Sequence, residues 1–274
     1  MTGPFLAAEI FKITPSGTLT TLHSFDGTDG DLPQAALVQG TDGNFYGTTN
    51  EGGPSGACNG GCGTVFKITP GGTLTTLSSF VNYPTDGVNP IAALIQGTDG
   101  NFYGTNSSGG VNFDGAIFKI TPSGTLTVLH SFDGTDGDSP AAALVLATDG
   151  NFYGTAPAGG ANGYGTVFRM TPSGTLTTLH SFDNTDGRLP NALIQDTSGT
   201  LYGTTESGTS VIGKYHRCTG ICGTVFSLSV DLSPFVESRP GSGTVGATVK
   251  ILGTNLTGVT SVTFNGTAAK FTVV

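Results

Sequence analysis

The sequence contains no tryptophan, only two methionines and few charged residues, and each scarcity narrows the classes of protein that it can encode. Charged side chains make up 11% of the 274 residues, and 10 Lys and Arg against 19 Asp and Glu give a net charge of −9. An acidic chain without a basic cluster repels phosphates, so we expect no nucleic-acid partner. Without tryptophan, the chain also lacks the best stacking surface for sugars. Since no run of 18 apolar residues is present, the sequence predicts no membrane span.

Glycine is abundant instead, at 45 residues, and it recurs at fixed places in a repeat. The stretch "TDGNFYGTT" at Thr41 returns as "TDGNFYGTN" from Thr98, "TDGNFYGTA" from Thr148 and "TSGTLYGTT" from Thr197. Successive copies are spaced by roughly 50 residues, a period typical of repeat architectures. The glycines therefore indicate tight turns in a repeated unit.

Each repeat contains four short segments rich in β-branched, aromatic and threonine residues. In the third copy they are "AALVL", "NFYGTA", "GTVFRMT" and "TLTTLHSF", and the tight-turn sequences "TDG" and "PSG" join the first pair and the second pair. The pattern predicts an all-β fold, in which each unit is the four-stranded antiparallel blade of a β-propeller. Alternation along "NFYGT" places the Phe and Tyr rings on opposite faces, against the two neighbouring blades, and the following Gly leaves room for an approaching ring.

The strand count leaves two arrangements open, because five copies of the third strand, starting with "EIFKIT" at Glu9, accompany four copies of the others. Either the strand at 18–25 closes a four-bladed ring onto the unit that begins at Pro190, or the chain is a piece of a larger ring. The start in the middle of a repeat favours the second, so we expect a fragment with four to five blades. The predicted propeller covers residues 1–231, with units starting near 33, 90, 140 and 190 and a partial unit at 5–25.

The loops between the second and third strands vary in length, and in a meander they emerge on the same face as the links between units. Loops held by a rigid scaffold are where recognition usually resides. The alternative is that they only cover the blade ends. The candidate ligand-binding residues lie in these loops: Phe113, Tyr164, Lys214, Tyr215, His216 and Arg217.

All four cysteines lie in the two longest of these loops, as "CNGGC" and "CTGIC". They can form local disulfides or a four-cysteine zinc site, and pairing between the loops requires neighbouring blades. Zinc ribbons prefer two intervening residues, whereas three separate each pair here, so we predict disulfides and no metal. The predicted disulfide cysteines are Cys58, Cys62, Cys218 and Cys222. Disulfides favour an oxidising compartment, and hence an extracellular or cell-surface location.

The links between units carry acids, as in "DGTDGD" at Asp26 and Asp133. Such oxygens can wrap a Ca²⁺ ion, but Asp residues also form Asx turns without any ion, and the Asx turn is the favoured interpretation. No other cofactor is indicated. His23, His130 and His180 share one slot, which indicates packing or a surface position on the outer strand, because a catalytic residue is normally unique. No catalytic residue is predicted, since no nucleophile elbow or phosphate loop is present.

The stretches "FKITPSGTLTTLHSFDGTDG" and "QGTDGNFYGTTNEGG" resemble the GloVer-type tandem repeats of bacterial choice-of-anchor surface proteins, over about residues 7–231. The resemblance implies export and attachment through varying C-terminal anchors, and no known reaction. The turn "DGNFYGT" also resembles two-component-regulator and streptogramin-lyase propellers, which transfers no active site. The stretches "PGSGTVG", "GTNLTG" and "VTFNGTAA" resemble the start of an IPT/TIG domain, which implies that residues 232–274 are the N-terminal half of an immunoglobulin-like sandwich. We expect any export signal to lie upstream of this fragment.

These features together predict a non-enzymatic extracellular or cell-surface repeat protein. We expect it to act in adhesion, or in binding a glycan or a surface protein, on the variable-loop face. One alternative is a propeller enzyme, a lyase or a glycan-acting hydrolase, with its active residues in missing blades. The other is a purely structural surface stalk.

Overall fold

The computed structural model describes residues 8–54, 58, 60–208, 222–233, 235–239, 248–253, 256, 259–264 and 267–272. The regular elements in these residues are β-strands, which confirms the all-β prediction. Within these ranges no helix has the length and hydropathy that a membrane crossing needs.

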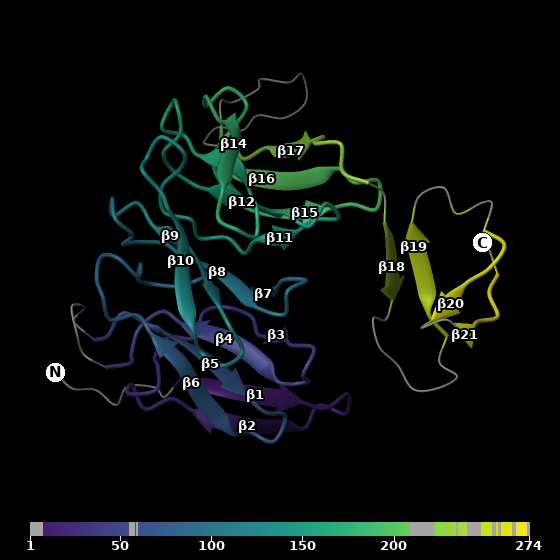
Figure 1. Cartoon of the computed structure of the whole chain (residues 1–274), viewed down its shortest axis with the longest axis horizontal. Helices are drawn as coiled ribbons and strands as arrows, with labels where there is room; N and C mark the ends of the chain where they lie inside the picture. The colour runs from purple at the N-terminus through teal and green to yellow at the C-terminus, as the bar shows by residue number, and fades with distance from the viewer. Residues whose placement is uncertain are drawn as a thin grey trace.

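Three complete four-stranded antiparallel blades form the centre of the molecule (Figure 1). The first blade comprises β3 (Val38–Gln39), β4 (Phe45–Thr49), β5 (Thr64–Ile68) and β6 (Leu74–Ser79). The second comprises β7 (Ile95–Gln96), β8 (Phe102–Asn106), β9 (Ala116–Ile120) and β10 (Leu126–Ser131). The third comprises β11 (Val145–Leu146), β12 (Phe152–Ala156), β13 (Thr166–Met170) and β14 (Leu176–Ser181). In each blade the strands pair in chain order, as the predicted meander requires.

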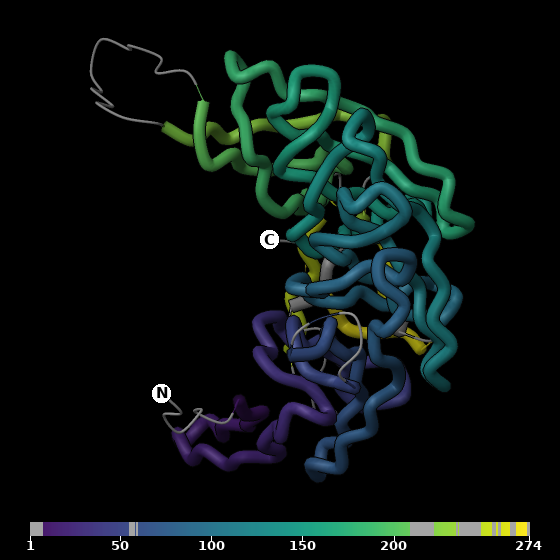
Figure 2. The backbone as a smooth tube through the Cα atoms, turned by 90° about the vertical axis from the view of Figure 1, so that its left-hand side faces the viewer, coloured from purple at the N-terminus to yellow at the C-terminus, as the bar shows by residue number. Residues whose placement is uncertain are grey.

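A sheet with fewer than four strands lies at each end of these blades. The N-terminal sheet pairs β1 (Glu9–Ile13) with β2 (Leu19–Ser24), and the C-terminal sheet holds β15 (Arg188–Gln195), β16 (Leu201–Ser207) and β17 (Val225–Leu228). Figure 2 shows the sheets following one another along an open arc, with these two at its opposite ends. The strand at 18–25 therefore pairs with β1 and does not complete the last unit, so the four-bladed closure is not the arrangement found.

The first strand of each blade is shorter than its sequence predicts. Of the segment "AALVL", only Val145 and Leu146 pair with β12. Leu144, just before them, is buried in the core cluster between the second and third blades. Packing between blades therefore holds this segment where the ladder is short.

Aromatic rings join consecutive blades. Tyr46 stacks on Phe102 of the next blade with ring centroids 3.9 Å apart, and Tyr103 meets Phe152 at 4.1 Å. The Tyr of one blade thus packs on the Phe of the following one, which confirms the prediction from the alternation along "NFYGT". A repeated edge-to-face contact, such as Phe80 against Phe118 with centroids 5.3 Å apart, adds a second aromatic link at each junction.

The C-terminal tail forms two small antiparallel pairs. β18 (Val236–Arg239) pairs with β19 (Lys250–Gly253), and β20 (Thr263–Phe264) pairs with β21 (Thr267–Ala268). In Figure 1 these strands lie to one side of the blades.

Candidate functional site

The repeated "DGNFYGT" motif ties a hairpin turn to a blade junction. In the second blade the Tyr103 hydroxyl donates to Asp99 Oδ2 at 2.8 Å, and Asn101 Nδ2 donates to the same oxygen at 2.7 Å. Burial raises the pKa of Tyr103, and the hydrogen bond to Asp99 and its negative charge raise it further. The same bond joins Tyr46 to Asp42 and Tyr153 to Asp149, each at 2.9 Å. The tyrosine is therefore a structural residue, with its ring in the junction and its hydroxyl on the turn.

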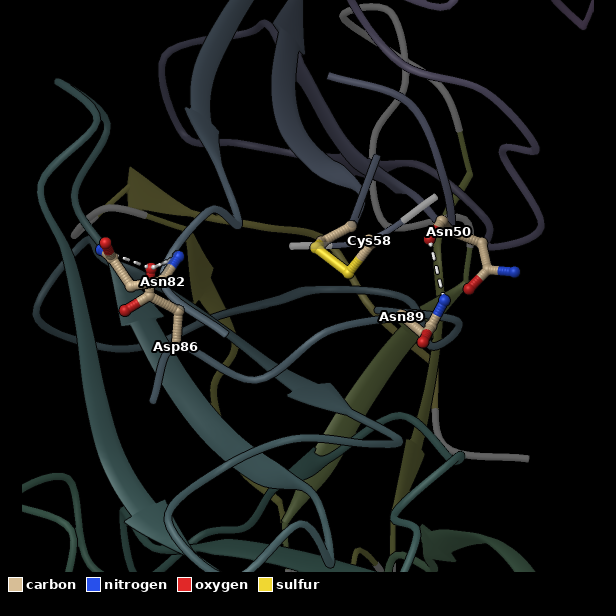
Figure 3. The surroundings of a disulfide bond; sticks show 6 residues. Asn50, Cys58, Asn82, Asp86 and Asn89 are labelled. Carbon is tan, nitrogen blue, oxygen red and sulfur yellow. Dashed lines mark hydrogen bonds between the residues drawn. A yellow bond between two sulfur atoms is a disulfide. The ribbon is translucent and has the colours of Figure 1, made fainter. Parts of the chain in front are cut away.

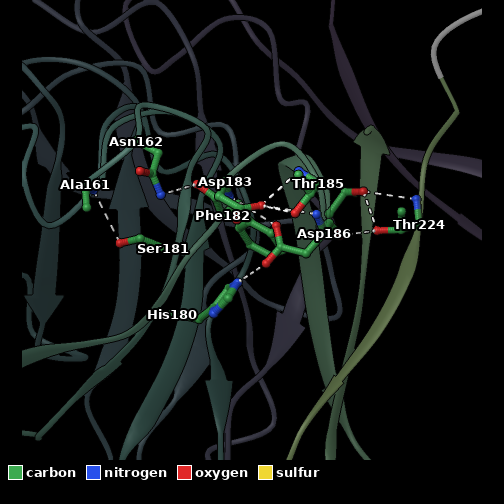
Figure 4. Close-up of polar contacts among 10 residues, drawn as sticks. Ala161, Asn162, His180, Ser181, Phe182, Asp183, Thr185, Asp186 and Thr224 are labelled. Carbon is green, nitrogen blue, oxygen red and sulfur yellow. Dashed lines mark hydrogen bonds and ion pairs between the residues drawn. The ribbon is translucent and has the colours of Figure 1, made fainter. Parts of the chain in front are cut away.

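Each of the three repeated histidines pairs with an aspartate six residues later. Nε2 of His23, His130 and His180 lies 2.6 Å from Oδ2 of Asp29, Asp136 and Asp186, respectively. Each ring also packs edge-on against the Phe two residues later. Sequence reasoning found the shared slot but missed the partner, although the constant six-residue spacing was a signal. Because the pair recurs in one setting, it fixes the link between blades and defines no unique reactive centre (Figure 4).

The acids in these links are bonded to their own loops. Asp183 Oδ1 accepts hydrogen bonds from Thr185 Oγ1 at 2.6 Å and Thr185 N at 2.9 Å, and Asp186 Oδ1 accepts from Asp183 N at 3.1 Å. The Thr185 hydroxyl, followed by the Thr185 amide, lowers the pKa of Asp183. These are Asx turns. The part of the chain that the structure describes holds no group of three His, Cys, Asp or Glu suited to a metal ion.

The loops between second and third strands meet the links between units on one face. Isolated bridges join Val88 to Ser108 and Asp138 to Ala158 across the two kinds of loop. On this variable-loop face Phe113, in the loop of the second blade, lies against Tyr83, in the preceding link, with ring centroids 5.8 Å apart. Phe113 is 56% exposed and Tyr83 is 45% exposed. We call these two residues the aromatic pair.

The backbone of Phe113 lies in the left-handed region, with φ of 72°. The same loop in the third blade has Gly163 at that position, with φ of 77°. The loops otherwise match: Asn112 Nδ2 donates to the carbonyl of Phe132, and Asn162 Nδ2 to that of Phe182. A non-glycine residue in this conformation costs about 1–2 kcal/mol. The second blade therefore holds an exposed, strained aromatic residue where its neighbour has a strain-free glycine.

Acidic groups surround Asp114, the residue that follows Phe113. Burial raises the pKa of Asp114, and the negative charges of Asp138, Asp133 and Asp136 add to the increase. The potential beside Phe113 is therefore negative, which favours hydroxyl-rich or cationic ligands over anions.

The other predicted binding residues fall into two groups. Tyr164 is half-buried and packs against the core cluster between the third blade and the C-terminal sheet, and its carbonyl accepts from Leu189 N. Lys214, Tyr215, His216 and Arg217 lie outside the described residues. Of the predicted set, Phe113 is the described residue with more than half of its surface exposed on the face. Sequence reasoning missed Tyr83, because it lies in a link and not in a variable loop.

A disulfide joins Cys58 to Cys62, with their Cα atoms 5.2 Å apart (Figure 3). Cys62 is buried in the core cluster between the first and second blades, and its carbonyl accepts from Asn89 N. Cys222 is also disulfide-bonded, and Cys218 lies outside the described residues. The loop of the first blade thus has the disulfide and not the zinc ligation that was the alternative.

Replacing both Cys58 and Cys62 with alanine is expected to lower the free energy of unfolding by about 2 kcal/mol, because the bond closes a short loop in the unfolded chain. Urea unfolding of the variant and the parent, both without reductant, measures the difference. The matched control is Ser108→Ala, a half-buried residue in the corresponding loop of the second blade whose backbone pairs with Val88. Equal midpoints for parent and double variant would contradict the prediction.

The meander blades and their aromatic junctions define a β-propeller repeat protein. The family model described as Gloeobacter/Verrucomicrobia repeat matches residues 2–216 and, in a second match, residues 55–269. The chain belongs to this family. The second match extends into the region that the sequence assigned to an immunoglobulin-like domain, and no comparison supports an IPT/TIG domain there.

Solved propellers share the fold at low identity. Virginiamycin B lyase from Staphylococcus aureus is 16% identical, with a TM-score of 0.53, over 82% of this chain and 64% of that one. A luciferin-regenerating enzyme is 13% identical, with a TM-score of 0.51, over 84% of this chain and 74% of that one. The chain thus spans less than two thirds of the lyase. No curated protein matches. At these identities the likeness shows the fold alone.

Proposed function

We propose that this chain is a non-enzymatic surface repeat protein that binds a glycan or a protein through its variable-loop face, as an adhesion module. The observation that carries the proposal is Phe113, an exposed aromatic residue in a strained backbone conformation where the next blade has Gly163. In this proposal the exposed ring contacts a ligand, since burial of the side chain does not offset the strain of its backbone.

The chemistry around Phe113 supports an uncharged or basic ligand. The ring faces of Phe113 and Tyr83 offer an apolar surface for a sugar ring or an arginine side chain. The carboxylates of Asp114 and its acidic neighbours supply acceptors for hydroxyl or guanidinium donors. The face is built from loops that the rigid blades position, as in other scaffolds that bind through their loops.

The proposal includes export of the chain. The family's repeat and the Cys58–Cys62 disulfide favour an oxidising, extracellular setting. In this proposal, residues 232–274 begin an immunoglobulin-like spacer of the IPT/TIG kind that carries the propeller away from its anchor.

Replacing Phe113 with glycine is expected to raise the free energy of unfolding by about 1 kcal/mol, because the left-handed conformation then carries no strain. The same change removes the exposed ring, so binding is expected to weaken by at least about tenfold, the typical effect of losing an aromatic anchor. Chemical unfolding measures stability. A glycan array, and then titration of the strongest array ligand, measures binding.

Asn184→Gly is the matched control, because Asn184 has the same φ of 72° in a link of another unit. It should leave binding unchanged, and it should raise stability less than Phe113→Gly does, because Asn tolerates the left-handed conformation better than Phe. Full binding by the Phe113→Gly variant would contradict a role for Phe113 in recognition. If neither the array nor a pull-down of surface proteins yields a ligand for the unsubstituted chain, the binding proposal fails and the structural stalk is favoured.

A further inference from the structure

The outward face of the N-terminal sheet is apolar and uncovered. Phe11 is 59% exposed, Ile13 is 63% exposed and Leu19, on the neighbouring strand, is 59% exposed. In the three complete blades the residues in the place of Phe11 and Ile13 have exposed fractions of 0% or 1%: Phe66, Phe118 and Phe168, and Ile68, Ile120 and Met170. We call the exposed set Phe11, Ile13 and Leu19 the N-terminal face.

The outward face of the C-terminal sheet is uncovered in the same way. Val225 is 78% exposed, Ile194 is 66% exposed and Tyr202 is 38% exposed. Residues in the place of Val225 and Tyr202 are again at most 1% exposed in the complete blades: Val65, Ile117 and Val167, and Tyr46, Tyr103 and Tyr153. We call the exposed set Ile194, Tyr202 and Val225 the C-terminal face.

The internal junctions show what covers each face. Between the first and second blades, Tyr46 and Val65 pack in one cluster with Phe118 and Ile120. Between the second and third, Tyr103 and Ile117 pack with Phe168 and Met170. In both clusters, the residues of the earlier blade occupy the places of Tyr202 and Val225 in the C-terminal face. The residues of the later blade occupy the places of Phe11 and Ile13 in the N-terminal face. The two exposed faces are therefore complementary, and each internal junction is a template for their contact.

The two faces lie at opposite ends of the open arc (Figure 2), so they do not cover each other within one chain. We propose that the C-terminal face of one copy of this chain binds the N-terminal face of a second copy, head to tail. The contact is heterologous, and it generates a closed ring or a filament according to the rotation between copies. Buried apolar surface drives it. The net charge of −9 on each copy opposes it, so added salt strengthens it.

Two variants test the proposal, and we call them one-sided because each disrupts one of the two faces and leaves the other intact. Ile13→Asp alters the N-terminal face and Val225→Asp the C-terminal face. The control is Val111→Asp, which adds the same charge at a residue 66% exposed in a loop away from both faces. Sedimentation velocity and light scattering over a range of concentrations and salt measure the assembly of the full chain. Thermal unfolding by circular dichroism confirms that each variant folds.

The parent and the Val111→Asp control are expected to self-associate with rising concentration and salt. Each one-sided variant alone is expected to associate at least about tenfold more weakly, because a carboxylate enters an apolar contact. An equimolar mixture of the two is expected to form a one-to-one heterodimer, since it restores one intact pair of faces.

A parent chain that stays monomeric at high concentration and high salt overturns the proposal. So does a one-sided variant that still assembles as the parent does, because a symmetric contact or another surface is then responsible. If either aspartate variant fails to fold, Phe11→Ser and Tyr202→Ser make a second pair with the same expected outcomes. None of these results depends on a ligand for the aromatic pair, so the two proposals fail separately.

Discussion

Raising the pH from 9 to 11 is expected to lower the free energy of unfolding by about 4 kcal/mol through three buried tyrosines, at about 1.4 kcal/mol each. Burial raises the pKa of Tyr46 to about 12 and that of Tyr153 to about 12, with the hydrogen bonds to Asp42 and Asp149 adding to the increase, and it raises the pKa of Tyr103 in the same way. An unfolded tyrosine loses its proton near pH 10. Between that pH and the folded pKa, the folded state holds protons that the unfolded state releases. The stabilisation is thus complete below pH 10 and is lost as the pH rises toward 12.

Urea unfolding at pH 9, 10 and 11 measures this loss. Tyr103→Phe is expected to cost stability at pH 9, because Asp99 loses a hydrogen bond from the hydroxyl, and to reduce the fall between pH 9 and 11 by about one third. Tyr83→Phe is the control, since Tyr83 is exposed in a link and has no place in a junction. The explanation fails if the fall is the same in the Tyr103→Phe variant as in the parent.

Gly104→Ala is expected to lower the free energy of unfolding by about 3 kcal/mol, the upper end of the usual range for overpacking. A Cβ at Gly104 would lie 2.6 Å from Cζ of Phe118 and 2.8 Å from Cδ2 of Leu94. Phe118 is fully buried in the core cluster between the first and second blades, so displacement of its ring would disturb that packing. Equivalent contacts surround Gly47 and Gly154, so every complete blade depends on a glycine at this place.

Two other glycines separate steric crowding from backbone conformation. Gly71→Ala should change stability by less than about 0.5 kcal/mol, because the turn is exposed and the added Cβ lies 3.8 Å from its nearest neighbour, Thr69 Oγ1. Gly100→Ala should cost about 1 kcal/mol, because its φ is +80° although the space is open. Chemical unfolding of the three variants checks the order. A cost for Gly104→Ala no larger than that for Gly100→Ala would contradict the packing argument.

The sequence was sufficient for the blade, because turn residues and side-chain alternation are local signals. The "TDG" and "PSG" turns predicted the hairpins, and the opposite faces of Phe and Tyr predicted the stacking of Tyr46 on Phe102. The hydrogen bond from the tyrosine to the turn aspartate could also have been predicted, because an aspartate stands four residues before the tyrosine in each complete blade. In the fourth copy Ser198 replaces that aspartate four residues before Tyr202, and Tyr202 is partly exposed.

The candidate site was less predictable, because it depends on contacts between loops of different units. Phe113 was predicted from its loop, but its contact with Tyr83 joins residues about 30 positions apart, for which no local pattern exists. Its backbone strain is visible in the sequence only when "GGVNFDG" is aligned with "GGANGYG", where Phe113 stands over Gly163. The pairing of His130 with Asp136 needed the fold of the link as well as its spacing.

The equivalence of the tyrosine junctions makes whole units exchangeable. Tyr46 meets Phe102 in the same way that Tyr103 meets Phe152, and the turn before each tyrosine is the same tripeptide. Excision of residues 98–147 would fuse Gly97 directly to Thr148 and bring Phe152 under Tyr46, with no new kind of contact. Gain or loss of one whole unit between these near-identical motifs would therefore lengthen or shorten the protein by one blade at a time, and each product would inherit junctions that already fit.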